Sequence, residues 1–466
     1  MLEIEAIRHL KINLSDYDYQ KDIHNRLVMA RFSTFDLEVL EEIIYNPLTI
    51  PIKKLLKHLD ISKENLLKTL LKLQEVNLLK IESDTIVVNK EMRKYYEFQL
   101  YKFDNDFRCD MEFLQGLLKK VPIHVLPLWY SIPRSSNCIF KSILEKFLKT
   151  PQLYQRYLLE LQDSEDAFTG IISEVLNSSN NMVKAKDLCA KFSLSKEKFE
   201  EYMLLLEFSF ACFLSYIKEG DEWVEVVTPL FELTEYLSHL KSTKITTTLD
   251  ESKVEVLRKN DFAFIEDLVK VLESLKKNPI DHEARREKVV QILALNAKNE
   301  KHQLYAERIF TKLILVRFIE EKQDKWYFSE NASEWLLMTV ENKALHYYRH
   351  PLNQMITYKG DPELCTERHF REAEKSIKRA LNVSWVLFDD FIKGVCISIG
   401  ENSCLKLACK GKHWSYEFPE YSQDEIDMIS AAVLENLFEA GMVSIGWHNN
   451  KAAFRVTEFG KSLFEF

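Results

Sequence analysis

FDLEVLEEIIYNPLTIPIKKLLKHLDISKENLLKTLLKLQEVNLLKIESDTIVVNKEMRKYY, residues 35–96, contains three short amphipathic segments in succession. Apolar residues recur at helical spacing over 36–45, again over 52–59, and again over 63–75, where Ser62 is a suitable N-cap. Two runs typical of β-strands follow, separated by Ser83-Asp84. The stretch therefore predicts three helices and then a β-hairpin.

The same order is predicted again along the chain. Residues 168–237 repeat it, and the third helices of the two stretches begin alike, with Ile61-Ser62-Lys63-Glu64 and Leu194-Ser195-Lys196-Glu197. A third candidate spans 287–337, with its first helix expected at 289–293, its last at 306–313 and no visible middle helix. In a fourth candidate, 422–466, Ser422 and Glu425 form a capping box that opens a long helix, and a hairpin follows Gly441.

With 466 residues, the chain is long enough for three or four separate cores. We therefore expect a series of modules along it. The expected segments are an N-terminal extension (1–30), a first module (31–97), a helical connector (98–161), a second module (162–240), a helical region with a possible third module (250–340), a basic helix with short strands expected at 395–399, 405–410 and 414–418 (341–420), and a C-terminal module (421–466).

Segments 35–96, 168–237 and 422–466 resemble the winged helix-turn-helix superfamily. The ending Phe454-Arg455-Val456-Thr457-Glu458-Phe459-Gly460 is similar to the strand, threonine cap and helix that close many such modules. The resemblance implies a mainly α fold with small β-hairpins, arranged as a multi-domain array of winged-helix-like modules. Tandem modules of this kind occur in transcription regulators, helicase-associated subunits and chromosome-partition proteins, and also in scaffolds that bind only proteins.

Glycine is scarce, with 10 residues in the whole chain, and the sequence has no GxGxxG, GxxxxGK[ST] or GxSxG motif. This disfavours dinucleotide-dependent enzymes, P-loop ATPases and α/β-hydrolases, since their phosphate or nucleophile loops need closely spaced glycines. No Ser, Cys or His is spaced as in a known catalytic set. We therefore expect no enzymatic activity and no cofactor.

The eight cysteines include no CxxC pair. Cys396, Cys404, Cys409 and His413 are residue types that bind zinc, but Cys404 and Cys409 are five positions apart on an expected strand and would point to opposite faces. We expect no metal and free thiols in a reducing compartment, either the cytoplasm, as a nucleoid-associated protein, or the nucleus. The sequence contains no apolar run long enough to span a bilayer, so we expect no membrane contact.

The net charge of −9 opposes binding to a polyanion, so any nucleic-acid contact must be local. The third helix of the first module predicts such a contact through its expected outer residues, which are Lys63, Asn65, Lys68, Thr69 and Lys72. The long C-terminal helix is the opposite case. Its five acids are expected to be unpaired, which favours a structural or protein-docking role; they are Asp424, Glu425, Asp427, Glu435 and Glu439.

A second basic stripe is predicted on the helix 367–381, where Arg368, Arg371, Lys375 and Lys378 follow at intervals of three, four and three, with Arg379 beside them. Upstream of this helix, four residues are expected to add stacking and phosphate contacts; they are Tyr347, Tyr348, Arg349 and His350. For both basic surfaces, an ordinary solvated helix with intrahelical ion pairs would give the same pattern.

Our leading hypothesis is a non-catalytic accessory or regulatory protein of DNA-linked machinery, such as transcription, helicase or chromosome complexes. It would contact double-stranded DNA through local basic patches and dock on proteins, for example a helicase or polymerase complex. The rival hypothesis is a scaffold whose winged helices bind only proteins. An enzyme with an unrecognised site is the third.

Overall fold

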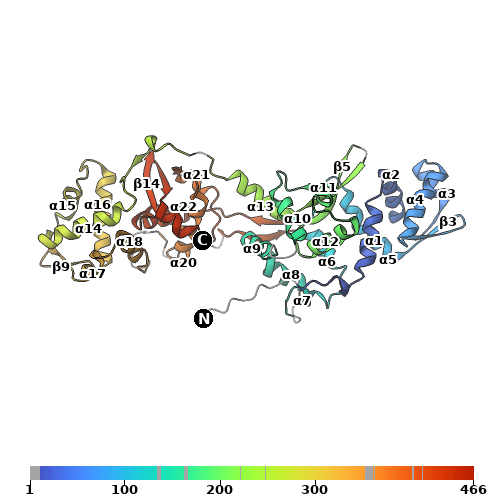
Figure 1. Cartoon of the computed structure of the whole chain (residues 1–466), viewed down its shortest axis with the longest axis horizontal. Helices are drawn as coiled ribbons and strands as arrows, with labels where there is room; N and C mark the ends of the chain where they lie inside the picture. The colour runs from blue at the N-terminus through green and yellow to red at the C-terminus, as the bar shows by residue number, and fades with distance from the viewer. Residues whose placement is uncertain are drawn as a thin grey trace. The chain divides into compact units, whose positions relative to one another are not determined.

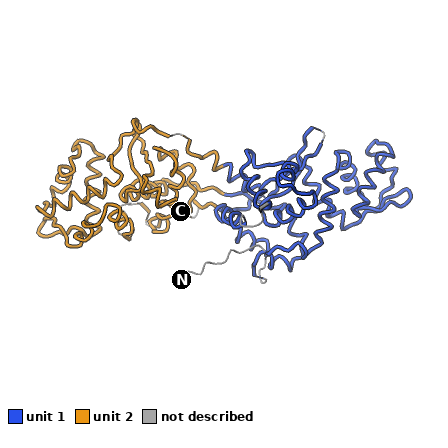
Figure 2. The backbone as a smooth tube through the Cα atoms, in the orientation of Figure 1, with its two compact units in different colours: residues 1–238, 406–416 blue, residues 239–405, 417–466 orange. Residues whose placement is uncertain are grey.

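The computed structural model describes residues 11–133, 138–161, 166–220, 222–246, 248–351, 360–361, 363–400, 403–411 and 413–465. It is mainly helical, with small antiparallel sheets (Figure 1). The chain divides into two compact units (Figure 2). Unit 1 comprises 1–238 and 406–416, and unit 2 comprises 239–405 and 417–466.

One order of elements occurs four times in the described chain: a helix, a short strand, two helices and a hairpin. In each repeat the second hairpin strand lies between the first hairpin strand and the short strand. The first repeat consists of α2 (Thr34–Tyr45), β1 (Thr49–Pro51), α3 (Ile52–Leu59), α4 (Lys63–Glu75), β2 (Leu79–Glu82) and β3 (Thr85–Val88). The second consists of α10 (Asp166–Asn177), β4 (Val183–Lys184), α11 (Ala185–Lys191), α12 (Lys196–Phe208), β5 (Phe213–Glu219) and β6 (Glu222–Thr228).

Unit 2 contains the other two repeats. The third consists of α14 (Ala263–Lys277), β8 (Ile280–Asp281), α15 (Arg285–Ile292), α16 (Glu300–Leu315), β9 (Ile319–Lys322) and β10 (Lys325–Phe328). The fourth consists of α20 (Glu367–Lys375) with the 3-10 turn η5 (Ser376–Ala380), β11 (Val386–Leu387), α21 (Phe388–Ile392), the continuous helix α22–η6–α23 (Gln423–Ser430, Ala431–Asn436, Leu437–Glu439), β14 (Val443–His448) and β15 (Lys451–Val456). One cluster of buried apolar side chains runs through both repeats.

The remaining elements surround the repeats of their own unit. Those of unit 1 are η1 (Leu14–Asp16), α1 (Tyr19–Met29), α5 (Lys90–Leu100), η2 (Tyr101–Phe103), α6 (Met111–Leu118), α7 (Leu126–Trp129), α8 (Ile139–Ile143), η3 (Leu144–Leu148), α9 (Pro151–Leu161) and most of α13 (Phe231–Ser242). Those of unit 2 are η4 (Glu251–Lys253), β7 (Glu255–Val256), α17 (Ala332–Leu336), α18 (Val340–Tyr348) and α24 (Glu458–Phe464).

All four third helices end in the same turn. One residue adopts a left-handed conformation, and the amide of the next residue donates to the carbonyl oxygen five positions before it. The left-handed residues are Asn77, Phe210, Arg317 and Gly441, with φ of 58°, 60°, 58° and 73°. The turn aligns the repeats, so equivalent positions on the third helices can be counted back from it.

Several local predictions are confirmed. Ser62 and Ser195 accept hydrogen bonds from the N3 amides of α4 and α12, and Ser422 forms the expected capping box with Glu425. Three element assignments are wrong. The helix expected to open the third repeat is its middle helix, α15, and α14 precedes it.

The fourth repeat also begins earlier than predicted. Its first two helices lie within 367–392, in the segment assigned to a separate basic helix, and residues 393–422 separate α21 from α22. The strand expected at 395–399 does not form. Instead, the Tyr421 hydroxyl group bonds to the backbone of Val395 and Ile397 where a neighbouring strand would lie.

The insertion between α21 and α22 carries a hairpin, β12 (Lys406–Lys410) and β13 (His413–Glu417). Its residues 406–416 belong to unit 1, although the chain on both sides belongs to unit 2. The Leu407 amide donates to the Lys149 carbonyl at 2.8 Å, and the Tyr416 hydroxyl group donates to the Leu148 carbonyl at 2.9 Å. The chain therefore passes between the units three times.

A buried network of charges joins α1 and η2 to α12, the third helix of the second repeat. Arg26 on α1 contacts Glu200 at 2.6 Å and Glu207 at 2.8 Å, and Lys102 contacts Glu207 at 3.2 Å. All four side chains are at most 2% exposed. Although burial raises the pKa of Glu207, the charges of Arg26 and Lys102 lower it to about 2. Through these contacts α1 packs on α12 and covers it.

Replacing Arg26 with methionine should lower the free energy of unfolding of unit 1 by about 3–5 kcal/mol, because two buried carboxylates lose their main cation. Urea unfolding of the full chain, followed by tryptophan fluorescence, measures the effect. As the control, R31M removes an exposed arginine paired with Glu75 and should cost less than about 1 kcal/mol. Equal stability of R26M and the wild type would contradict the assigned role of the network.

Glu232 is a second buried charge-bearing group in unit 1. Its Oε1 accepts the Met111 amide at 3.0 Å, while its Oε2 has no hydrogen-bond partner among the described residues. Burial, assisted by the charges of Asp110 and Glu235, raises the pKa of Glu232 to about 8. The folded protein therefore keeps a proton that the unfolded chain releases above a pKa of about 4.5.

This difference should make stability fall as the pH rises from about 4.5 to about 8, with the full contribution of protonated Glu232 present below that window. The E232Q variant should lose this part of the pH dependence. Urea unfolding at several pH values across the window, with E97Q at an exposed glutamate of α5 as the control, tests it. A slope unchanged in E232Q would show that Glu232 is not the group responsible.

Candidate nucleic-acid interface

The four third helices differ in what covers their outer faces. The structure describes each of these helices over its full length. In α12, the residues from Phe199 to Phe208 are mostly buried, with α1 packed on them. The α16 helix contacts the η6–α23 part of the fourth repeat's third helix through ion pairs. The outer face of α4 carries a row of exposed side chains. Among the four third helices, α4 is therefore the one whose outer face is available to a partner.

The contact between α16 and α23 combines charge with apolar packing. Arg308 on α16 lies 2.8 Å from Glu435, and Lys312 lies 2.8 Å from Glu439, whose side chain is fully buried. Beside them, the Phe438 ring contacts the rings of Phe264 and Tyr305, with centroids 6.0 and 6.2 Å apart. An acidic helix thus covers the basic face of α16.

The prediction that the C-terminal helix presents unpaired acids is therefore wrong. Glu435 and Glu439 are paired with α16, and Glu425 is buried, accepting hydrogen bonds from the Ser422 amide and the Ser403 hydroxyl group. Asp427 accepts a hydrogen bond from Gln423. The cationic partners come from a helix far away in the sequence, so the local pattern gave no sign of them.

The sequence-predicted residues on α4 fall into two groups. Lys63, Asn65 and Lys68 are exposed, as predicted, and Lys68 forms a solvent-exposed pair with Glu64 at 3.1 Å. Such an exposed pair adds little stability and is easily exchanged for a pair with another anion. Leu71, 60% exposed, lies on the same helix.

Thr69 and Lys72 instead face α2. The Thr69 hydroxyl group donates to Asp36 at 2.7 Å, and Lys72 also contacts Asp36 at 2.7 Å. Because Thr69 is 2% exposed, it cannot contact a nucleic acid, and its place in the predicted set is wrong. The Lys72 side chain is 41% exposed but already paired. The sequence reading missed Asp36, which is buried at the start of α2.

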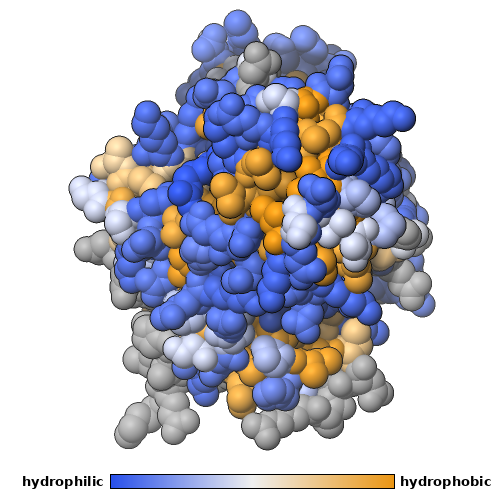
Figure 3. Space-filling view, turned by 90° about the vertical axis from the view of Figure 1, so that its right-hand side faces the viewer, coloured by the Kyte–Doolittle hydropathy of each residue, from blue (hydrophilic) through white to orange (hydrophobic). Residues whose placement is uncertain are grey.

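The preceding helix extends the basic face. Lys53, Lys54 and Lys57 on α3 are exposed, and Lys54 donates to the Asn46 side chain at 2.7 Å. Residues 52–73 contain six lysines against one aspartate and one glutamate, whereas 31–97 contain eleven basic and eleven acidic residues. Figure 3, which looks toward the first repeat, shows a mostly hydrophilic surface with apolar residues between. Positive charge is thus concentrated on α3 and α4, which we call the α3–α4 face.

Three lysines of the α3–α4 face have no ion pair or hydrogen bond through their side chains to any described residue: Lys53, Lys57 and Lys63. Their charge is not neutralised within the described chain. This makes them the strongest candidates for contact with an anion. Only Lys63 among them was singled out from the sequence. Lys53 and Lys57 were missed because the prediction of a nucleic-acid contact considered only the third helix.

The second predicted basic stripe is divided by the fold. Arg371 contacts Glu374 at 2.9 Å and lies over the Tyr348 ring, while Arg379 donates to the carbonyl oxygens of Phe391 and Thr243, each at 2.6 Å. These two arginines are therefore engaged by other residues of unit 2. Arg368, Lys375 and Lys378 are exposed, and Lys375 pairs with Glu372 at 2.7 Å.

The stripe is discontinuous because the α-helix ends at Lys375 and a 3-10 turn follows, which changes the angle between successive side chains. The upstream aromatic residues are also engaged. The Tyr347 hydroxyl group donates to Glu439 at 2.6 Å, and that of Tyr348 donates to Glu374 at 2.8 Å. The prediction that they stack on a nucleic acid does not fit these buried contacts.

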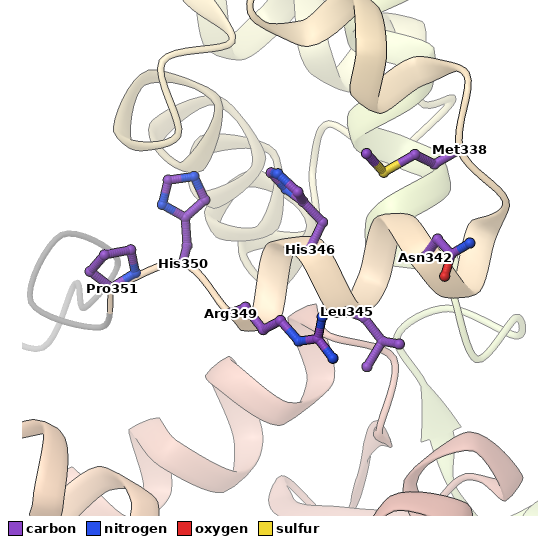
Figure 4. A pocket seen from close by; sticks show the side chains of 7 residues that line it. All are labelled: Met338, Asn342, Leu345, His346, Arg349, His350 and Pro351. Carbon is purple, nitrogen blue, oxygen red and sulfur yellow. The ribbon is translucent and has the colours of Figure 1, made fainter. Parts of the chain in front are cut away.

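Arg349 and His350 line a surface pocket of about 510 Å³ beside α18 (Figure 4). The other lining residues are Met338, Asn342, Leu345, His346 and Pro351. The ring centroids of His346 and His350 are 6.0 Å apart, and none of the described residues that line the pocket carries a carboxylate, thiol or hydroxyl group.

Within the described residues, no group of three or more His, Cys, Asp and Glu side chains is arranged to hold a metal ion. Cys396 lies 3.8 Å from His239, and Cys409 and His413 are on the inserted hairpin in the other unit. No described helix is long and apolar enough to span a bilayer. Comparison with known proteins gives no family model that matches the chain and no curated protein similar to it.

The pairing of α23 with α16 can be tested by E439Q, which leaves the 3% exposed Lys312 without its carboxylate. The free energy of unfolding of unit 2 should fall by about 3–5 kcal/mol in urea titrations. As a control, D427N alters an exposed acid on the same helix and should change it by less than about 1 kcal/mol. Similar losses in both variants would argue against a special role for Glu439.

Proposed function

We propose that this chain is a non-catalytic accessory protein of DNA-linked machinery, built from four winged-helix modules. The first module contacts double-stranded nucleic acid through the α3–α4 face, and the other three use their third helices for packing within the chain. The four repeats support the module assignment, since each has the helix order and the three-strand hairpin arrangement that the winged-helix resemblance implies.

The observation that carries the proposal is the contrast between α4 and α16. Counting back from Asn77 and Arg317, Lys68 is equivalent to Arg308 and Lys72 to Lys312. By the same count, Asn65 is equivalent to Tyr305. The cations are thus retained, while the apolar ring that receives Phe438 on α16 is replaced by an amide on α4.

This difference favours a hydrated anion as the partner of α4. A helix docks stably when apolar side chains are buried beside the ion pairs, as Tyr305 and Phe438 are on α16. A phosphate backbone needs only cations and polar groups, because its affinity comes largely from release of counterions. The unpaired lysines of the α3–α4 face supply those cations, although the whole chain is negatively charged.

A second candidate function is a scaffold in which α4 also docks on protein. It is favoured by Leu71, which is 60% exposed on α4, and by the acidic helix that already covers the equivalent face of α16. The partner would then be an acidic helix with an apolar residue for Leu71. Under both functions the proposed protein partners are helicase or polymerase subunits, in the cytoplasm or the nucleus.

The decisive experiment is binding of the full chain to a fluorescent 20-base-pair duplex at low salt, measured by anisotropy. Relative to the wild type, K53E/K57E/K63E should bind at least about tenfold more weakly, since three phosphate contacts become repulsions. The matched control K90E/K94E/K119E changes the same net charge at exposed lysines outside the α3–α4 face.

Equal loss in the two triple variants would mean that net charge, rather than the α3–α4 face, controls binding. Absence of binding by the wild type would overturn the nucleic-acid function and leave the protein scaffold. Circular dichroism of each variant shows whether the fold is intact.

A further inference from the structure

We infer that the α3–α4 face holds a duplex through its phosphates alone and does not read base sequence. This inference rests on the proposed function and narrows the ligand to double-stranded nucleic acid of any sequence. The α3–α4 face presents lysines, and most of its other polar side chains are buried or hydrogen-bonded within the fold.

The α3–α4 face has no arginine. Its six cations are all lysines, from Lys53 to Lys72. Arginine reads guanine with two parallel hydrogen bonds from a rigid fork, whereas a lysine ammonium acts as a flexible point charge. Lysines at an exposed surface therefore suit phosphates, which present the same charge at every base pair.

The fold also removes most other groups that could read bases. The Thr69 hydroxyl group is buried against Asp36, the Ser62 hydroxyl group accepts the Asn65 amide at 3.3 Å, and His58 lies 2.7 Å from Glu42. Of the predicted polar contacts, the Asn65 side chain remains exposed in the first turn of α4. A single amide contacts one base pair at most, which is too little to specify a site.

The hairpin of the first repeat adds no basic contact at its tip. Glu82, Ser83 and Asp84 are exposed there, and Ser83 has the positive φ of a tight turn. Two carboxylates at this position would repel a phosphate backbone, which disfavours contact through the tip. The contact that we propose is the one made by α3 and α4.

The number of contacts follows from the unneutralised charges. Lys53, Lys57 and Lys63 are unpaired in the described chain, and Lys68 has only its exposed pair with Glu64. About four phosphates can then be neutralised, which gives a slope of roughly −3 to −4 for log K against log salt concentration. Such a small contact area produces weak binding that salt abolishes readily.

The test titrates the full chain with 20-base-pair duplexes of three unrelated sequences, one A·T-rich, one G·C-rich and one mixed, at several salt concentrations. The dissociation constants should agree within about threefold at each salt concentration, and N65A should alter each by less than threefold. A tenfold preference for one sequence, or loss of a preference in N65A, would overturn the inference while leaving the nucleic-acid function intact.

The two claims fail in different ways. If no duplex binds at low salt, or if K53E/K57E/K63E binds all three as tightly as the wild type, the proposed function fails and this inference with it. If binding depends on those lysines but also on sequence, only the inference fails. Single strands of the same sequences, included as competitors, should compete less than the duplexes; stronger competition would assign the surface to single strands instead.

Discussion

Each unit depends on one fully buried glutamate of a third helix, held by an arginine and a lysine. Glu207 on α12 is paired with Arg26 and Lys102, and Glu439 on α23 is paired with Arg308 and Lys312. A carboxylate withdrawn from water is tolerable only when cations and hydrogen bonds compensate for its lost hydration. The helices that carry these groups must therefore stay in their packed positions, and their faces are not available to a partner.

That constraint gives the repeats different roles although they share one order of elements. In every repeat the third helix packs against the first strand of its hairpin, so this contact is common to all four. What differs is the outer face, where charge and ring type determine the neighbour. Glutamates on α12 attract α1, and Arg308 with Lys312 attract α23. Only α4 keeps an outer face of lysines and an amide that no described element covers.

Local features of the fold could be predicted from the sequence, because caps and helical periodicity act over a few residues. Ser62, Ser195 and Ser422 mark helix starts as expected, and the hairpins follow. Only the second half of the fourth repeat could be predicted, because residues 393–422 separate its second helix from its third. On the candidate site, the exposed positions of α4 were read correctly from spacing, but Thr69 was not, since its burial depends on Asp36 in another helix. The acids of α22–α23 were misjudged for the same reason: their cations lie far away in the sequence.

The open state of α4 follows from the way in which unit 1 uses its acids. In unit 2, the acidic third helix neutralises the basic one, Glu435 and Glu439 meeting Arg308 and Lys312. Unit 1 also has an acidic third helix, α12, and a basic one, α4, so the same neutralisation is chemically possible there. In unit 1, Glu200 and Glu207 are instead paired with Arg26, Lys102 and Lys196. Because α1 and η2 supply Arg26 and Lys102 from outside the repeats, the acids of α12 are neutralised without α4. On α4, Lys72 is paired with Asp36, Lys68 has only its exposed pair with Glu64, and Lys63 has no partner among the described residues. The result is a surface that could attract an external anion.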